Sequence, residues 1–351
     1  MKLKTNANIY IIIIIIYNYI MQKILIICYY GFSEPLDTVK NELNKLGYDV
    51  IGFPLLEQYN LDEQKTSYYR ILDKYIKENN PQYILWWCFN IYPTHLKYIT
   101  SNNPQVKNYL FNWDDPYCWY DPNYEHKIRS IERAFITSEA KFEQYQDLGC
   151  KPVLTYPGYN KIIHFPIKEH DLDDIDYYHC DISICCTNLY SNKDVYPDQI
   201  INRFDLVNDI YNNMDKYGYK FHIYGPEFLQ NLYPRAYKKE LCYIDTNKVF
   251  NYSKINICTH VTNGKSYLNE RVILILASGG LLFVDPVDGI NSFFNDKKDE
   301  YCVTIDKNNY LTQIKSILDN YQNYKSIKTS GHNFVSDKDW FNQMQIITRY
   351  M

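Results

Sequence analysis

Residues that can bind an anion are concentrated between positions 259 and 271. Lys265 and Arg271 carry positive charge there, and the planar guanidinium of Arg271 matches two phosphate oxygens. Gly264 lets a ligand approach the backbone closely. The same stretch supplies further polar side chains, namely His260, Ser266 and Asn269. These residue types predict a phosphate-binding site.

The segment 253–294 predicts the elements that hold these residues in place. Positions 255–258 are a short apolar run, and positions 268–278 have the spacing and length of a helix. Gly279 and Gly280 end that helix, and a second buried strand follows at 281–284. Such a unit implies a parallel sheet whose ligand crevice lies beyond the carboxyl ends of the strands, where the N-terminus of the helix favours anions. The alternative, that Glu270 and Arg271 form a solvated helix face, stays open at this point.

Alternating strands and helices extend through most of the chain. In the first half, the apolar runs predict strands at 24–28, 49–53, 83–89, 106–111, 134–137 and 153–156, and helices at 37–46, 68–78, 124–133 and 139–148. In the second half, they predict strands at 181–186, 220–224, 241–244, 255–258, 281–284 and 302–305, and helices at 198–217, 268–278 and 309–320. The fold class is therefore α/β, with two Rossmann-like doubly wound domains facing each other across a cleft.

The expected boundaries follow from where this alternation stops. We expect an N-terminal domain at 22–158, a linker at 159–179 that contains the acidic run HDLDDID, and a C-terminal domain at 180–336. A last helical stretch, about 337–351, is a candidate to pack back on the N-terminal domain.

Composition excludes several classes of function. The net charge of the 351 residues is only −4 and there is no basic block, so no nucleic-acid partner is expected. The ten cysteines form no C-x-x-C pair, which is typical of buried thiols in a reducing compartment and predicts neither disulfides nor a zinc site. A cytoplasmic protein without a bound metal or cofactor is expected.

The N-terminal extension, residues 1–21, contains an apolar run at 9–21 that follows two lysines. This run is shorter than the ~20 residues that a membrane-spanning helix needs, and no small-residue cleavage site follows it. We therefore expect the folded protein to begin near Met21, with a membrane anchor as the alternative.

Six segments carry a resemblance to a known family: NPQYILW at 80–86, FNWDDP at 111–116, FITSEAKFEQYQDLG at 135–149, DISICCTN at 181–188, FHIYGP at 221–226 and YLNERVILILASGGLLFVDPVDGINSFF at 267–294. With them, most of residues 22–345 resembles the CgeB-type, spore-protein-like glycosyltransferases, which have GT-B architecture. The last segment is the most specific of the six. The resemblance implies a metal-independent enzyme whose C-terminal domain binds a nucleotide-sugar donor and whose N-terminal domain binds an unidentified acceptor.

The resemblance also implies roles for individual residues. Thr187 and Asn188 would lie in the loop after the first strand of the donor domain, and Arg203 would begin its first helical region. Gly225 and Pro226 would border the nucleotide base. Asn269 and Arg271 would lie near the diphosphate.

Two positions depart from the family pattern. Leu274 stands where the family has a carboxylate that is expected to hold the ribose hydroxyls, and leucine cannot accept hydrogen bonds. Ser266 stands where related retaining enzymes have an upstream glutamate. Glu270, one helical turn before Leu274, is the candidate to substitute for a missing carboxylate.

Transfer of a sugar needs a base for the acceptor hydroxyl and a cation for the leaving diphosphate. Asp114 follows the predicted strand 106–111 and is the candidate base, with a loop carboxylate that bonds nearby amides as the alternative. His260 is either a ligand to the donor or a structural histidine, and turn formation accounts for Asp285 and Asp288. The leading hypothesis is therefore a glycosyltransferase. The alternative, motivated by Leu274, is a catalytically silent GT-B-like protein that binds a glycan or a partner.

Overall fold

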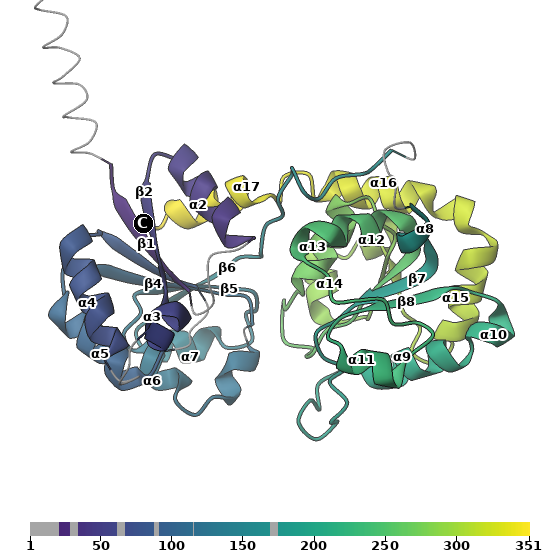
Figure 1. The fold of residues 1–351 in the computed structure, drawn as a ribbon, viewed down its shortest axis with the longest axis horizontal. Coiled ribbons are helices and arrows are strands. Elements are labelled where there is room, and N and C mark those ends of the chain that lie inside the picture. Colours follow the sequence, from purple (N-terminus) through teal and green to yellow (C-terminus); the bar gives the residue numbers. More distant parts are fainter. Residues whose placement is uncertain (1–20, 29–33, 62–66, 88–90, 115, 169–174) are drawn as a thin grey trace, which may run out of the picture.

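Two parallel β-sheets form the centre of the molecule (Figure 1). The computed structural model describes residues 21–28, 34–61, 67–87, 91–114, 116–168 and 175–351. The first sheet has the strand order β2-β1-β3-β4-β5-β6, and the second has the order β11-β10-β9-β7-β8. The predicted fold class, two doubly wound α/β domains, is confirmed.

The strands of the first sheet are β1 (Lys23–Cys28), β2 (Asp49–Pro54), β3 (Tyr83–Trp87), β4 (Lys107–Asn112), β5 (Arg133–Ile136) and β6 (Lys151–Leu154). Those of the second sheet are β7 (Cys180–Cys185), β8 (Phe221–Tyr224), β9 (Ser253–Cys258), β10 (Leu282–Val284) and β11 (Val303–Thr304). All of these strand pairs are parallel. Continuous apolar runs such as Ile24 to Ile27 are buried on both faces of a sheet, which is why the sequence shows them without alternation.

Helices cover both faces of the N-terminal sheet. They are α2 (Leu36–Lys45), α3 (Leu55–Leu61), α4 (Tyr68–Asn79), α5 (Pro93–Asn102), α6 (Tyr124–Ile128) and α7 (Phe142–Asp147), with a 3-10 turn η1 at Tyr117–Tyr120. The sequence did not predict α3 or α5, and the helix predicted at 124–133 ends at Ile128. Ser130 lies outside it, where the chain turns into β5.

The helices of the C-terminal domain enclose its sheet in the same way. They are α8 (Ile175–Tyr178), α9 (Arg203–Asn212), α10 (Met214–Tyr217), α11 (Phe228–Leu232), α12 (Thr246–Tyr252), α13 (Glu270–Ala277), α14 (Asp288–Phe293), α15 (Tyr310–Asp319) and α16 (Lys325–Phe334), with 3-10 turns η2 (Tyr243–Asp245), η3 (Lys298–Glu300) and η4 (Tyr321–Tyr324). The helix predicted at 198–217 is divided at Asn213, the residue between α9 and α10.

The strand predicted at 241–244 is wrong. Residues 243–245 form η2, and the extended backbone lies slightly earlier in the chain, where Tyr237 forms a parallel bridge with Ile223 of β8. The turn predicted around Asp288 is also wrong, because Asp288 is the first residue of α14.

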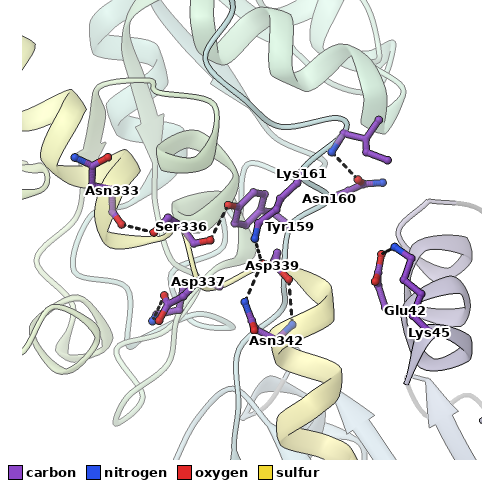
Figure 2. A network of polar contacts seen from close by, with 12 residues as sticks. Glu42, Lys45, Tyr159, Asn160, Lys161, Asn333, Ser336, Asp337, Asp339 and Asn342 are labelled. Carbon is purple, nitrogen blue, oxygen red and sulfur yellow. Dashed lines mark hydrogen bonds and ion pairs between the residues drawn. The ribbon is translucent and has the colours of Figure 1, made fainter. Parts of the chain in front are cut away.

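The chain passes between the two domains twice, at neighbouring positions. The first passage contains Tyr159, which forms a parallel bridge with Asp339 in the second passage. Lys161 pairs with the carboxylate of Asp339, and the Tyr159 hydroxyl donates to the Ser336 carbonyl at 3.4 Å (Figure 2).

The second passage leads into α17 (Trp340–Thr348), which returns to the N-terminal domain and lies beside α2 (Figure 1). Trp340, Met344 and Ile347 are buried in the core on that face of the first sheet. The last helix therefore belongs to the N-terminal core, although it follows the C-terminal domain in sequence.

None of the helices in the described ranges combines the length and the apolar character needed to cross a membrane. The apolar run predicted as an extension or anchor lies, except for Met21, outside the described residues.

Candidate functional site

A pocket of about 220 Å³ opens at the carboxyl ends of β7 and β8 and at the start of α13. Three parts of the C-terminal domain meet there: the two strand ends, the segment 240–250 and the first turn of α13. The lining residues are Cys185, Cys186, Thr187, Tyr224, Gly225, Pro226, Glu240, Leu241, Tyr243, Thr246, Phe250, Glu270, Arg271 and Leu274. Five predicted site residues are among them: Thr187, Gly225, Pro226, Glu270 and Arg271.

The first turn of α13 gives the pocket its positive end. Asn269 caps this helix, because its side-chain oxygen accepts a hydrogen bond from the Arg271 amide at 2.9 Å. The guanidinium of Arg271 bonds to no acceptor in the described part of the chain, although the charge of Glu270 lies near it. A helix N-terminus and an arginine without an acceptor among the described residues are features that favour an anion.

Two carboxylates, one from each domain, interact electrostatically near this end. Burial raises the pKa of Glu270, and the negative charge of Asp114 raises it further, while Arg271 opposes the shift. Asp114 reaches solvent, but the surrounding protein still removes enough hydration to raise the pKa of its carboxyl. Both groups therefore hold a proton more readily than ordinary surface carboxyls.

The loop after β4 fixes the position of Asp114. The Asn112 side chain accepts a hydrogen bond from the Asp114 amide at 3.1 Å and donates to the Tyr124 hydroxyl at 3.0 Å. The Trp113 carbonyl accepts a hydrogen bond from Thr137 at 3.0 Å. Asp114 thus lies at the carboxyl edge of the first sheet, where the sequence placed it.

The loop between β9 and α13 contacts the N-terminal domain instead of lining the pocket. The Lys265 carbonyl accepts hydrogen bonds from the Ser138 hydroxyl at 2.7 Å and from the Glu139 amide at 2.9 Å. The Ser266 hydroxyl donates to the Glu139 carboxylate at 2.7 Å, and the Lys265 ammonium lies 3.4 Å from it. We call these contacts between Ser138, Glu139, Lys265 and Ser266 the interdomain clasp.

Gly264 lies in the same loop and faces the N-terminal domain. A Cβ atom there would lie 3.0 Å from the Pro116 side chain and 3.4 Å from the Ser138 hydroxyl. Gly264 also lines a second cavity, of about 270 Å³, between the domains. The structure thus places Gly264, Lys265 and Ser266 at the domain interface.

His260 is fully enclosed and paired with Asp285. Its Nδ1 lies 2.6 Å from one carboxylate oxygen of Asp285, and its backbone amide donates to the other at 2.8 Å. Nε2 is buried without a partner among the described residues. This pair explains Asp285 better than the predicted turn does.

Arg203 is buried, and protein acceptors occupy its guanidinium. It donates to the Thr259 hydroxyl at 2.7 Å, to the Thr259 carbonyl at 2.8 Å and to the Asn188 carbonyl at 2.7 Å. It also lies over the ring of Tyr190. Arg203 and Asn188 therefore join the loops after β7 and β9, and neither lines the pocket.

The largest omission of the sequence prediction is the segment 240–250. Glu240, Leu241, Tyr243, Thr246 and Phe250 all line the pocket, but no motif marks them. The only sequence signal was the apolar run at 241–244, which predicted a strand and so concealed a loop at the sheet edge.

In the part of the chain that the structure describes, no group of three or more histidine, cysteine, aspartate or glutamate side chains is placed to hold a metal ion.

Comparison with known proteins shows which family of folds this chain is similar to. Residues 205–346 match a family model described as glycosyl transferase-like, whereas no curated protein sequence matches the chain. Sucrose-phosphate synthase from Thermosynechococcus elongatus has a similar structure, with a TM-score of 0.64 and 11% identity, over 94% of this chain and 98% of that one.

Two further solved structures share the fold over almost the whole chain. A glycosyltransferase from Rickettsia africae has a TM-score of 0.61 and 12% identity, with 95% of this chain and 98% of that one covered. HepE from Anabaena, solved in complex with UDP and glucose, has a TM-score of 0.63 and 10% identity, with 94% and 99% covered. The fold is that of the GT-B glycosyltransferases, and the family match together with this fold supports a glycosyltransferase.

Proposed function

We propose that this protein transfers a sugar from a nucleoside-diphosphate sugar to an acceptor. The observation that carries the proposal is the Arg271 guanidinium, which lies in the pocket at the start of α13 without an acceptor from the described protein. A partly desolvated cation is costly unless an anion accompanies it. A diphosphate group would accept from both Arg271 and the first amides of α13.

The nucleoside would occupy the remainder of the pocket. Gly225 and Pro226 form one wall, and Leu241 and Phe250 supply apolar surface for a base. HepE, which has the same fold, binds UDP and glucose, and this supports a nucleotide sugar as the donor.

Asp114 would act as the general base of the transfer. As the acceptor oxygen attacks the anomeric carbon, Asp114 takes the hydroxyl proton and the bond from that carbon to the diphosphate breaks. Arg271 and the N-terminus of α13 would stabilise the negative charge that develops on the leaving diphosphate. The charge of Asp114 contributes to the raised pKa of Glu270, which lines the pocket, and this supports the assignment.

We further propose that the transfer needs no bound metal, because Arg271 and the helix N-terminus supply the positive charge. Turnover that is unchanged by EDTA is the expected result. Loss of turnover with EDTA and recovery with Mg²⁺ or Mn²⁺ would contradict it.

A CgeB-type enzyme is the finer form of this proposal, supported by the segment 267–294. Leu274 favours the second candidate, a catalytically silent GT-B-like protein that binds a glycan or a partner. Leu274 lines the pocket, so the missing carboxylate is a feature of the site itself.

Release of nucleoside diphosphate separates these two candidates. Residues 1–351 would be incubated with UDP-, GDP-, CDP- and dTDP-sugars, with and without a panel of acceptor glycans. We expect slow hydrolysis of one nucleotide family, faster turnover with an acceptor, and roughly 10²-fold lower turnover in Asp114→Asn with unchanged donor affinity. Donor binding without any turnover would support the silent binder.

A further inference from the structure

The pocket lacks an obvious group to hold a ribose. A ribose presents two neighbouring hydroxyls, and a carboxylate is the side chain that accepts from both. Leu274 lies in the pocket wall one helical turn beyond Arg271 and cannot accept a hydrogen bond. The hydroxyl of Thr246 already donates to the Tyr243 carbonyl at 2.6 Å.

Two carboxylates line the pocket, and they lie in different surroundings. Glu270 precedes Arg271 in the first turn of α13, where the diphosphate would bind, and the charge of Asp114 in the other domain acts on it. Glu240 belongs to the opposite wall, with Leu241, Gly225 and the rest of the nucleoside end.

Backbone pairing fixes where Glu240 lies. The segment before it runs alongside β8: the Ile223 amide donates to the Ala236 carbonyl at 2.9 Å, and the Gly225 amide donates to the Lys239 carbonyl at 3.1 Å. These backbone hydrogen bonds place Glu240 in the pocket beside Gly225, and they do not depend on the Glu240 side chain.

The Glu240 carboxylate has no competing partner in the described ranges. No described residue donates a hydrogen bond to it, and the nearby Lys239 and Lys248 lie 3.2 and 3.6 Å from Asp245 instead. An acceptor-only side chain is thus exposed in the wall of the pocket and available to a ligand.

From this geometry we propose that Glu240 accepts hydrogen bonds from the ribose hydroxyls of the donor nucleotide. It would take over, from the other wall of the pocket, the role that Leu274 cannot perform. This inference rests on the proposed function. Its consequence is that the site prefers a ribonucleotide to its 2′-deoxy counterpart, by roughly tenfold for one charge-assisted hydrogen bond.

Calorimetric titration with UDP, GDP and CDP and with their 2′-deoxy forms tests the inference. For the nucleotide that binds best, wild type should prefer the ribose form. Glu240→Ala should weaken binding of that form more than binding of the 2′-deoxy form, which keeps only the 3′-hydroxyl, so that the preference disappears. Glu227→Ala, an exposed glutamate two positions beyond Gly225 that does not line the pocket, should keep the preference.

A second variant moves the carboxylate to the other wall. Glu240→Ala combined with Leu274→Glu should restore the preference for ribose, and circular dichroism would establish that the double variant is folded. An equal loss of affinity for both forms in Glu240→Ala, or a wild type without preference, would overturn the role of Glu240 and leave the donor site intact. Absence of binding by every nucleotide would instead overturn the proposed function and this inference with it.

Discussion

Arg203 and Arg271 have the same side chain in the same domain, yet only one of them is available to a ligand. Arg203 donates to two backbone carbonyls and one hydroxyl, so its charge is used to join two loops. Arg271 has no such acceptors in the described chain and lines the pocket. A sequence shows residue types and spacing but not which hydrogen bonds are already made, so both arginines could be named as candidate donor-binding residues.

The paired carboxylates give a testable pH dependence. A base acts only when it is deprotonated, and the pKa values of Asp114 and Glu270 are both raised, so turnover should fall on acidification at a higher pH than for an ordinary carboxyl. Burial raises the pKa of Asp114, whereas the charge of Asp114 contributes to the raised pKa of Glu270. Asp114 therefore loses its proton while Glu270 is still neutral, and Glu270→Gln should leave the pKa of Asp114 in place.

The measurement is the pH profile of kcat/KM. The acidic limb of Glu270→Gln should lie at the same pH as that of wild type and of Glu143→Gln, a control at an exposed residue of α7. A limb that moves to lower pH in Glu270→Gln would show that the charge of Glu270, and not burial alone, raises the pKa of Asp114.

At the scale of elements, the close approach of β7 and β8 shapes the floor of the pocket. A Cβ atom on Gly225 would lie 2.1 Å from the Cys186 carbonyl oxygen, which is backbone and cannot move aside alone. Gly225→Ala should therefore lower the free energy of unfolding by about 1–3 kcal/mol and weaken nucleotide binding.

Thermal or urea unfolding checks this effect, with Gly264→Ala as the matched control. The corresponding Cβ at Gly264 meets only side chains, the nearest at 3.0 Å, so a smaller loss is expected. Equal stability of Gly225→Ala and wild type would mean that the two strand ends separate readily.

Elements with a strong apolar pattern could be predicted from the sequence, and elements set by tertiary contacts could not. The strands around Ile24 and Ile257 are buried on both faces, so their apolar runs were unambiguous. The extended segment before Glu240 is held by hydrogen bonds to β8, whose partners are distant in sequence. The sequence therefore contains no local pattern that predicts the position of this segment in the pocket.

The same reason explains which site residues were found. The helix α13 could be predicted, at 268–278, because its apolar spacing and the glycines that follow it are local signals, although it begins at Glu270 after the Asn269 cap. The interdomain clasp could not be predicted from the sequence, because Glu139 and Ser266 are far apart in the chain. Lys265 and Ser266 consequently resembled ligand-binding residues, although the structure shows them in contact with the other domain.

At the scale of the whole molecule, two kinds of contact hold the domains together. The first is the pair of neighbouring chain segments near Tyr159 and Asp339, whose polar contacts Figure 2 shows. The second is the interdomain clasp, which joins the loop before α13 to the N-terminal domain. Because the donor pocket belongs to one domain and Asp114 to the other, the clasp should matter for transfer more than for donor binding.

Glu139→Ala removes the acceptor of the Ser266 hydroxyl and of the Lys265 ammonium. We expect kcat to fall several-fold while donor affinity stays within about twofold of wild type, since one partly exposed, charge-assisted contact contributes about 1 kcal/mol. Glu143→Ala, on the same N-terminal domain, should change neither quantity. A parallel loss of donor affinity in Glu139→Ala would show instead that the clasp shapes the donor pocket.

The claim on which the account depends is that Arg271 and the start of α13 bind a diphosphate. Calorimetric titration of UDP, GDP, CDP and dTDP into wild type, Arg271→Ala and Arg235→Ala, an exposed arginine paired with Asp215, tests it directly. The account predicts that one nucleotide binds wild type and Arg235→Ala alike, and Arg271→Ala roughly 10- to 100-fold more weakly. Equal affinity in wild type and Arg271→Ala, or no binding by any of the four nucleotides, would contradict it.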